Sequence, residues 1–188
     1  MSFGLRTVNC QRSIVNSQLR MMNVLVRQWK VEDLPSVQHI AWTTWLASYG
    51  SFIPEADMRS FFDLYYTVDT LREFCTSQTA RGFLADVDST PVGFAKTNYE
   101  SSKKRFYLNS LYILPEHQGK GVGAKLLRAS EEFALSLNAH EVWLGVMTQN
   151  VAALDWYKRI GFQFVNEEPF TMGNTTVMHL IGYRAIKN

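Results

Sequence analysis

The chain of 188 residues has the length of one ordinary domain and is long enough to bury a substantial core. It is 46% hydrophobic and 19% charged with a formal net charge of +2, which is typical of a globular protein and gives no sign of nucleic-acid binding. No apolar run approaches the roughly 20 residues that cross a bilayer, so no membrane-spanning segment is expected.

Residues 1–21 differ from the rest of the chain, because they hold three arginines, no acidic residue and no secretory apolar core. A transit peptide has this composition. A leader translated from an upstream start codon would look the same, since Met21 and Met22 offer alternative starts. We interpret residues 1–21 as an N-terminal extension and expect the domain to occupy residues 22–188.

Beyond residue 22 the pattern becomes regular, with period-two runs that predict strands and period-3.6 runs that predict helices. The helix at 69–78 is expected to be capped by Asp69 or Thr70. Cys10 and Cys75 have no metal-binding or redox spacing, so no metal site is expected and both are interpreted as incidental thiols of a reducing cytoplasm. In chain order the expected elements are strand 23–29, helices 32–50, 53–68 and 69–78, two strands within 81–100, strand 105–114, helix 121–138, strand 141–147, a short helix from 150 that stops before Gly161, and strands 162–165 and 175–186.

Three glycines at every second position, Gly119, Gly121 and Gly123, separate a strand from a helix in the stretch LNSLYILPEHQGKGVGAKLL. Glycine lets a backbone approach a ligand closely, and amides at a helix start carry the positive end of the helix dipole. The pattern is therefore typical of a phosphate-binding turn, although a plain strand-to-helix connection can contain the same glycines.

The spacing around these glycines distinguishes the known phosphate-binding motifs. A Walker loop needs Ser or Thr after its Gly-Lys pair, whereas Lys120 is followed by Gly121. Gly119, Gly121 and Ala124 satisfy the G-x-G-x-x-A fingerprint of dinucleotide-binding proteins, and Glu141 follows Gly119 by 22 residues. The first glycine of that fingerprint directly follows its strand, but here PEHQ intervenes. A nicotinamide-dependent oxidoreductase is therefore kept only as an alternative.

The segment Gln118–Gly123 also resembles the Q/R-x-x-G-x-G/A signature of the GNAT superfamily of N-acetyltransferases. In that family the signature follows a strand like LYILPEH, opens a long helix and precedes a segment like QNVAALDWYKRIGF. Asn150, Tyr157, Gly161 and Phe162 match this second motif.

The resemblance covers the chain from Met22 onward and is strongest over residues 108–164. It implies a single α/β (α+β) domain in which helices flank a mixed, mostly antiparallel sheet. The sheet is expected to be splayed between its fourth and fifth strands. The resemblance also implies acetyl-CoA as co-substrate.

Roles for individual positions follow from the resemblance. The amides of Gln118–Gly123 are expected to hold the pyrophosphate, and the backbone of Leu111–Ile113 to pair with the pantetheine arm as an added strand would. Asn150 is expected to hydrogen-bond the coenzyme, although a helix N-cap is a plainer role. Tyr157 is expected to protonate the departing thiolate, although a core aromatic is a plainer role. The cofactor-binding positions are then Leu111, Tyr112, Ile113, Gln118, Gly119, Lys120, Gly121, Val122, Gly123 and Asn150.

This chain departs from the resemblance at the general base. Many relatives carry a glutamate where this chain has Asn109, whose amide cannot accept a proton. A protonated acceptor amine has a pKa of about 10 and must lose its proton before attack. Glu100, Tyr107 and His179 are candidates by their placement on strands, and the base is left unassigned.

Charge is unevenly distributed along the chain. Residues 51–100 hold four basic and eight acidic side chains, whereas residues 101–128 hold six basic and one acidic. Basic side chains near the glycines are expected to meet coenzyme phosphates, and acids on the helices that shape the acceptor side in this family to attract a cation. A solvated helix surface is the plainer explanation. The acids in question are Glu55, Asp57, Asp63, Asp69 and Glu73.

We therefore expect a cytoplasmic, acetyl-CoA-dependent N-acetyltransferase that acts on a small-molecule cationic amine such as a polyamine. The closing segment PFTMGNTTVMHLI also resembles the end of polyamine-type acetyltransferases. Peptide N-termini, aminoglycosides and amino acids stay open as acceptors, as does a non-catalytic CoA-binding module, which Asn109 suggests. Relatives in this family are often dimers, so a homodimer is compatible with the resemblance, and no nucleic-acid or membrane partner is expected.

Overall fold

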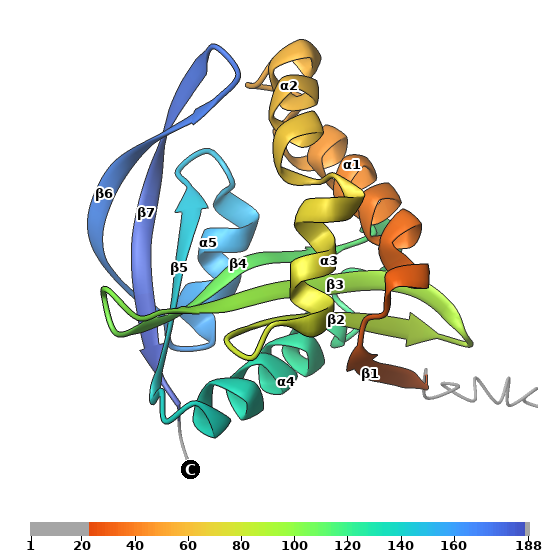
Figure 1. Ribbon diagram of the computed structural model, residues 1–188. Coiled ribbons are helices and arrows are strands. Elements are labelled where there is room, and N and C mark those ends of the chain that lie inside the picture. Colours follow the sequence, from red (N-terminus) through yellow and green to blue (C-terminus); the bar gives the residue numbers. More distant parts are fainter. Residues whose placement is uncertain (1–22, 187–188) are drawn as a thin grey trace, which may run out of the picture.

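The computed structural model describes residues 23–186 and contains seven strands in one sheet (Figure 1). The spatial order is β1-β2-β3-β4-β5-β7-β6, and every neighbouring pair is antiparallel except β4 and β5. The expected fold class, a mixed and mostly antiparallel sheet with flanking helices, is confirmed. The strands are β1 (Val24–Gln28), β2 (Ala80–Val87), β3 (Thr90–Glu100), β4 (Arg105–Ile113), β5 (Glu141–Met147), β6 (Gln163–Met172) and β7 (Thr175–Ala185).

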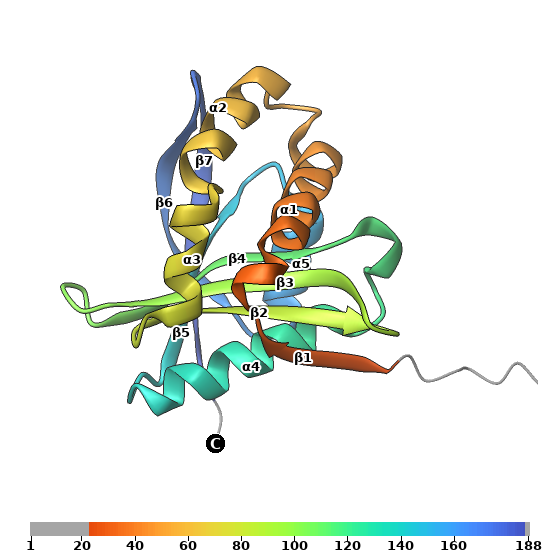
Figure 2. The ribbon, with the colours of Figure 1, turned by 45° about the vertical axis from the view of Figure 1, so that its right-hand side comes forward.

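Five α-helices cover the two faces of this sheet (Figures 1 and 2). Helices α1 and α3 pack on one face, and α4 and α5 belong to the core on the other. Within residues 23–186 no helix is long and apolar enough to cross a membrane. The helices are α1 (Leu34–Tyr49), α2 (Glu55–Tyr65), α3 (Val68–Thr76), α4 (Val122–Ser136) and α5 (Val151–Arg159), with short 3-10 turns at η1 (Val31–Asp33) and η2 (Pro115–His117).

The alternation of side chains along the central strands produces two hydrophobic cores. On β2, Phe83 and Ala85 belong to the core under α4 and α5, whereas Leu84 belongs to the core under α1, α2 and α3. Period-two alternation of an apolar strand buried on both sides has this consequence. The central sheet is thereby fixed between two apolar layers.

Three sequence expectations need correction or fall outside the structure. Helix α3 begins at Val68 and is capped by Thr67, whose Oγ1 accepts a hydrogen bond from the Thr70 amide at 3.1 Å, so neither Asp69 nor Thr70 is the cap. Strand β6 extends to Met172 instead of ending at residue 165, because it pairs along its length with β7. The expected extension 1–21 and Cys10 lie outside the described residues.

A β-bulge in β4 shapes the middle of the sheet. Lys96 of β3 pairs with Ser110, but its neighbour Thr97 pairs with Leu108, so Asn109 has no partner on β3. An extra residue of this kind bends its strand and increases the local twist. The bulge therefore turns the second half of β4 relative to the first.

The bend separates β4 from β5. The two strands pair at only two positions, Phe106 with Val142 and Tyr107 with Trp143. Beyond Tyr107 one edge of β4 has no strand beside it, and the expected splay between the fourth and fifth strands is found there. The candidate site lies in this opening.

The turn between β6 and β7 is fastened to the start of α2 by Asp57. Its carboxylate accepts hydrogen bonds from the Asn174 amide at 2.9 Å and from the Thr175 hydroxyl at 2.6 Å. Hydrogen bonds from Thr175 and Asn174 lower the pKa of Asp57 below its ordinary value. Gly173 lies in this turn with a φ of +60°, and a Cβ there would lie 2.6 Å from the Asp57 Cα.

We predict that Gly173→Ala lowers the free energy of unfolding by about 1–3 kcal/mol, because it combines a left-handed backbone with a collision. Gly173→Asn is the matched variant, since asparagine tolerates positive φ but still carries a Cβ. Urea denaturation measures both. If Gly173→Asn is as stable as the wild type, the collision with Asp57 is not what constrains this position.

Candidate active site

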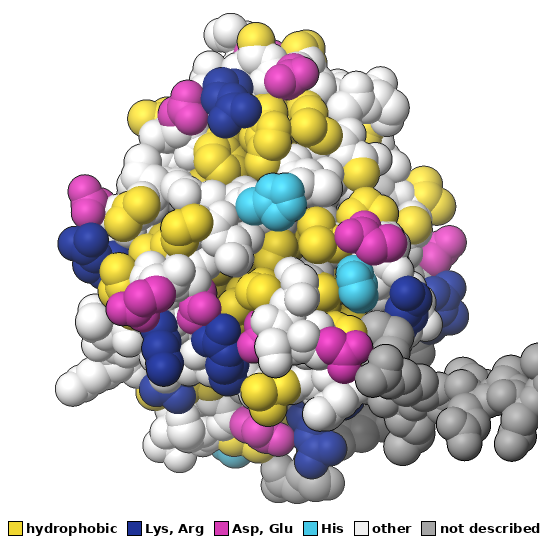
Figure 3. Space-filling view, turned by 90° about the vertical axis from the view of Figure 1, so that its right-hand side faces the viewer, with side chains coloured by type: hydrophobic (Ala, Val, Ile, Leu, Met, Phe, Trp, Pro, Cys, Tyr) yellow, Lys and Arg dark blue, Asp and Glu magenta, His cyan; other side chains and the backbone are white. Residues whose placement is uncertain are grey.

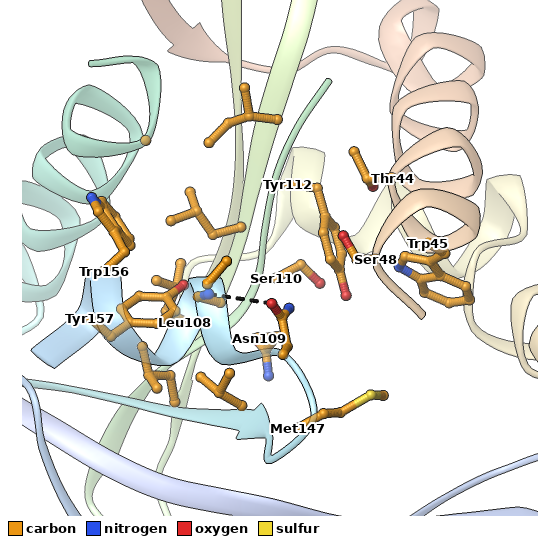
Figure 4. A pocket seen from close by; sticks show the side chains of 18 of the residues that line it. Thr44, Trp45, Ser48, Leu108, Asn109, Ser110, Tyr112, Met147, Trp156 and Tyr157 are labelled. Carbon is orange, nitrogen blue, oxygen red and sulfur yellow. Dashed lines mark hydrogen bonds between the residues drawn. The ribbon is translucent and has the colours of Figure 1, made fainter. Parts of the chain in front are cut away.

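A cavity of about 920 Å³ lies where β4 and β5 diverge. Its walls come from α1, α2, the middle of β4, β5, α5 and the segment Gln118–Gly123, which we call the glycine turn. Figure 4 shows Tyr157 of α5 and Tyr112 of β4 on opposite sides of this pocket, with Ser110 between them. Segments far apart in the sequence therefore converge on one space.

The glycine turn forms one end of the cavity. Gly119 and Gly121 have φ values of +71° and +82°, and a Cβ built on either would meet no heavy atom within 4 Å. Gly121 is the N-cap residue of α4. Both positions therefore combine a backbone conformation that favours glycine with open space in front of it.

The amides of this turn are free to bind a ligand. Within residues 23–186, no backbone carbonyl accepts a hydrogen bond from the amides of residues 119–124, whereas the Lys125 amide donates to Gly121. Unpaired amides at a helix start form a site for an anion. Gln118 differs, because its amide donates to Pro115 and its side-chain Nε2 donates to the Ile113 carbonyl at 3.0 Å. The run of unpaired amides therefore begins at Gly119, one residue after the start of the predicted segment.

The remaining positions of the turn have different surroundings. A Cβ at Gly123 would lie 3.1 Å from the Ile113 side chain and 3.4 Å from Trp156, so this glycine allows close packing between α4, β4 and α5. Val122 and Gly123 are buried and line the cavity, whereas the side chain of Lys120 is exposed and does not. Lys120 can therefore fulfil its predicted role only through its unpaired backbone amide.

The free edge of β4 forms the floor between this turn and the middle of the sheet. Leu111, Tyr112 and Ile113 pair with β3 on one side and have no strand on the other. All three line the cavity. An extended chain with amide groups could therefore pair with this edge as an added strand does.

Tyr157 projects from α5 into the cavity. Its ring packs against Trp156 and Phe162, with centroids 4.8 and 5.2 Å apart, and 8% of the residue is exposed. Its hydroxyl makes no hydrogen bond within the described part of the chain, and Figure 4 shows it directed toward the pocket. Burial raises the pKa of Tyr157 well above its ordinary value, so the phenol is protonated at neutral pH.

Asn150 lines the cavity and is the N-cap of α5. Its Oδ1 accepts a hydrogen bond from the Ala153 amide at 3.3 Å. Its Nδ2 has no partner within residues 23–186 and can donate toward the cavity. The N-cap role that sequence reasoning considered is therefore observed, and it leaves the amide nitrogen available to a ligand.

The candidate bases have different surroundings. Asn109 and His179 line the cavity, whereas Glu100 and Tyr107 do not. His179 stacks on Phe170 with centroids 4.2 Å apart and planes 10° apart, and burial lowers its pKa from 6.5 to about 4. A histidine that is neutral and weakly basic at pH 7 is a poor proton acceptor, so of the three candidate bases the one that lines the cavity is weak.

Most of the charges expected to divide the cavity lie elsewhere, although Arg159 of α5 does line it. None of the five acids on α2 and α3 lines it, and Asp57 instead fastens the turn between β6 and β7. Of the basic residues around the glycines, Lys125 donates to the Val24 carbonyl at 3.1 Å and Arg128 pairs with Glu132. On the face shown in Figure 3, hydrophobic side chains gather near the middle and most charged ones lie toward the edges. The plainer explanation, a solvated helix surface, therefore fits the four exposed acids, whereas Asp57 is buried and has a structural role.

Several wall residues escaped sequence reasoning, among them three with polar or charged side chains. Lys96 comes from β3, Ser110 from β4 and His117 from the turn before the glycines. His117 Nδ1 is buried without a partner in the described chain, and Ser110 Oγ lies 2.9 Å from the Tyr66 hydroxyl. A lysine within the apolar strand VGFAKTN was the signal that could have identified Lys96.

Comparison with known proteins gives a family for this architecture. A sequence model described as the acetyltransferase (GNAT) family matches residues 34–162. Spermidine N(1)-acetyltransferase of Thermoplasma acidophilum is 28% identical over 146 residues, which are 76% of this chain and 89% of that protein. Streptothricin acetyltransferase of Streptomyces lavendulae is 35% identical over 86 residues, so the match spans 45% of this chain and only 46% of that relative.

Solved structures agree on the fold. The PaiA N-acetyltransferase of Thermoplasma acidophilum, in complex with coenzyme A, superposes with a TM-score of 0.72 at 24% identity. The superposition covers 85% of this chain and 99% of that one. The likeness extends over nearly the whole described domain.

We predict that stability falls as pH drops from 7 to 5, in part through His179. Its folded-state pKa of about 4 lies below the ordinary 6.5, so the unfolded chain binds the proton first and stability is lost from about pH 6.5 downward. Glu168, the neighbouring carboxylate on β6, opposes this shift. Thermal unfolding at both pH values tests the idea in wild type and His179→Gln. An equally steep pH dependence in the variant would remove His179 from the explanation.

Proposed function

Because the chain belongs to the acetyltransferase (GNAT) family, we propose that it transfers the acetyl group of acetyl-CoA to a primary amine. The amine attacks the thioester directly while both substrates occupy one cavity. The observation that carries this proposal is the alignment of three features along that cavity. These are the unpaired amides of residues 119–124, the free edge of β4 and the unpaired hydroxyl of Tyr157.

The binding of the co-substrate follows from these features. The amides from Gly119 to Gly123 hold the diphosphate at the N-terminus of α4, where the helix dipole favours negative charge. Gln118 supports the turn through its bond to Ile113 and lines the same space. The β4 edge at Leu111–Ile113 pairs with the amide-bearing arm, and Asn150 donates to it through Nδ2.

Tyr157 acts as the general acid. When bound, acetyl-CoA supplies an acyl group on a thiolate leaving group of pKa about 8.5. The Tyr157 phenol stays protonated because burial raises its pKa, so a proton is always present at its hydroxyl. A phenol with a raised pKa gives up its proton less readily, so Tyr157 is proposed to act largely through a hydrogen bond to the departing sulfur.

No side chain is assigned as general base. Asn109 cannot take a proton, and His179 has a pKa of about 4. The acceptor therefore loses its proton to solvent before attack, or through water held at the Asn109 bulge. Activity should accordingly rise with pH over the range in which the free amine becomes populated.

The observations are divided on the acceptor class expected from the sequence, a polyamine. The spermidine acetyltransferase relative favours it, and the aromatic residues in the wall offer faces for a cation. No acidic side chain lines the cavity within the described residues, and Lys96 does line it. Aminoglycosides, peptide N-termini and amino acids therefore belong in the same acceptor panel.

Two alternative functions make different predictions. A non-catalytic CoA-binding module is favoured by Asn109 and would bind acetyl-CoA without releasing thiol in the presence of any amine. A nicotinamide-dependent oxidoreductase would bind NADH. It fits less well, because η2 separates the end of β4 from Gly119. Thermal shift with acetyl-CoA, CoA and NADH distinguishes it from the other two.

Location and assembly are proposed from the family resemblance alone. We propose a cytoplasmic enzyme whose domain starts near Met22 and whose partner is a small-molecule amine. Size-exclusion chromatography with light scattering tests whether it forms the homodimer that the resemblance allows.

Our first functional prediction concerns Gly121 and compares Gly121→Asp with Gly121→Asn. Both residues tolerate positive φ and serve as N-caps, so the fold is kept, but only aspartate places negative charge before the free amides. We expect acetyl-CoA to bind Gly121→Asp at least about tenfold more weakly than Gly121→Asn. Isothermal titration calorimetry measures this, and equal affinities would contradict a diphosphate at the turn.

The second prediction concerns Tyr157→Phe, which removes the hydroxyl and keeps the ring packing. We expect kcat to fall by about a hundredfold with little change in KM for acetyl-CoA, because the acid acts on the leaving group. Tyr183→Phe is the matched control, since Tyr183 stacks on Trp143 outside the cavity. Steady-state kinetics decide the matter: an unchanged kcat would return Tyr157 to a packing role.

A further inference from the structure

Lys96 is a cationic side chain in the cavity wall with no anionic partner. Its Nζ lies 4.5 Å from the ring centroid of Tyr66 and 5.2 Å from that of Phe74. Within residues 23–186 its side chain makes no ion pair and no hydrogen bond, and the cavity lining contains no Asp or Glu. The proposed function gives Lys96 no role.

The fold places Lys96 away from the glycine turn, which the proposed function assigns to the coenzyme. It pairs with Ser110 on β4, and directly paired residues of antiparallel strands share a face of the sheet. Gly93, three residues earlier on β3, pairs with Ile113 near the glycine turn. Lys96 therefore lies about 10 Å farther along the sheet from that turn, at roughly 3.3 Å per residue.

The surroundings of Lys96 combine hydroxyl groups with aromatic rings. Ser110 Oγ and the Tyr66 hydroxyl lie 2.9 Å apart beside it. Phe61 and Tyr65 of α2 line the same cavity. This arrangement offers a cation and hydroxyl groups for an anionic oxygen, and apolar faces for the remainder of a ligand.

Energetics indicate that the arrangement is incomplete without a ligand. Burial alone lowers the pKa of Lys96 from 10.5 to about 8, so the protein disfavours its charge. The two aromatic rings offset part of this penalty. Charged groups withdrawn from water are normally paired, because the unpaired charge is costly. An anion bound beside Lys96 would supply the missing partner, whereas a polyamine would add like charge.

We propose that Lys96 binds a carboxylate of the acceptor, so that the acceptor is an amino acid or a similar carboxylate-bearing amine instead of a polyamine. The inference rests on the proposed acetyl-CoA-dependent function and specifies its second substrate. Lys96 is then a specificity-determining residue that contacts the carboxylate of the acceptor and not its reacting amine.

The experiment uses pairs of amines that differ only in the carboxylate. L-Phenylalanine is compared with phenethylamine, and L-lysine with cadaverine, with spermidine as a further acceptor. We expect kcat/KM to be at least about tenfold higher for a carboxylate-bearing member in one or both pairs, mainly through KM. Equal values in both pairs, or spermidine as the best acceptor, would overturn the proposal.

Variants isolate the contribution of Lys96. Lys96→Met keeps the length and removes the charge. The ratio of kcat/KM between the carboxylate-bearing amine and its partner should therefore fall about ten- to a hundredfold. Lys96→Arg keeps the charge and should keep most of this ratio. Lys30→Met removes an exposed lysine and should leave the preference intact. If Lys96→Met instead lowers kcat equally for all four amines and leaves the kcat/KM ratio within each pair unchanged, Lys96 acts as a base. That result would contradict the proposal.

A binding measurement separates this proposal from the proposed function. The thermal shift caused by N-acetyl-L-phenylalanine in the presence of CoA is compared with that of N-acetylphenethylamine. We expect stabilisation by the first only, and its loss in Lys96→Met. If CoA itself causes no shift, the proposed function fails. If CoA stabilises the protein but both products behave alike, only the carboxylate proposal fails.

Discussion

The separation of β4 from β5 is the constraint on which the site depends. If the two strands stayed paired along their length, side chains of the sheet would fill the space that the cavity occupies. The single extra residue at Asn109 bends β4 after two pairs with β5 and frees one edge of the strand. Every functional feature of the cavity adjoins this opening: the free edge itself, the glycine turn that follows it and Tyr157 across from it.

Because Asn109 lies at the bulge beside this opening, its identity bears on the chemistry of the cavity. The family that the sequence resembles often has a glutamate at the position of Asn109. This is the one position of β4 without a partner on β3. A side chain there lines the cavity and is not held by cross-strand neighbours. Asn109 can hold water or a ligand by hydrogen bonds but cannot remove a proton, so this chain needs another way of obtaining a neutral amine.

The sequence predicted the fold and the glycine turn well, because both depend on local signals. Apolar periodicity determines the strands and helices, and the requirement for positive φ at Gly119 and Gly121 is visible in the residue type. It predicted β6 poorly, because that edge strand is mostly exposed and lacks alternation. The acids on α2 and α3 were assigned to the acceptor side from the family resemblance of their helices, but the direction in which each side chain points depends on packing, and none of them lines the cavity. Lys96 was missed for a related reason, since its place in the cavity follows from its register with Ser110.

The titratable groups of the cavity share one trend that bears on catalysis. Burial raises the pKa of Tyr112 and Tyr157 and lowers that of Lys96 and His179, so each group is shifted toward its neutral form. An acceptor ammonium that enters this space meets the same desolvation. Its pKa, about 10 in water, should therefore fall as well. We infer that desolvation by the cavity performs part of the work of the absent glutamate. A carboxylate beside Lys96 would hold the amine there without placing an acidic side chain near the reacting nitrogen.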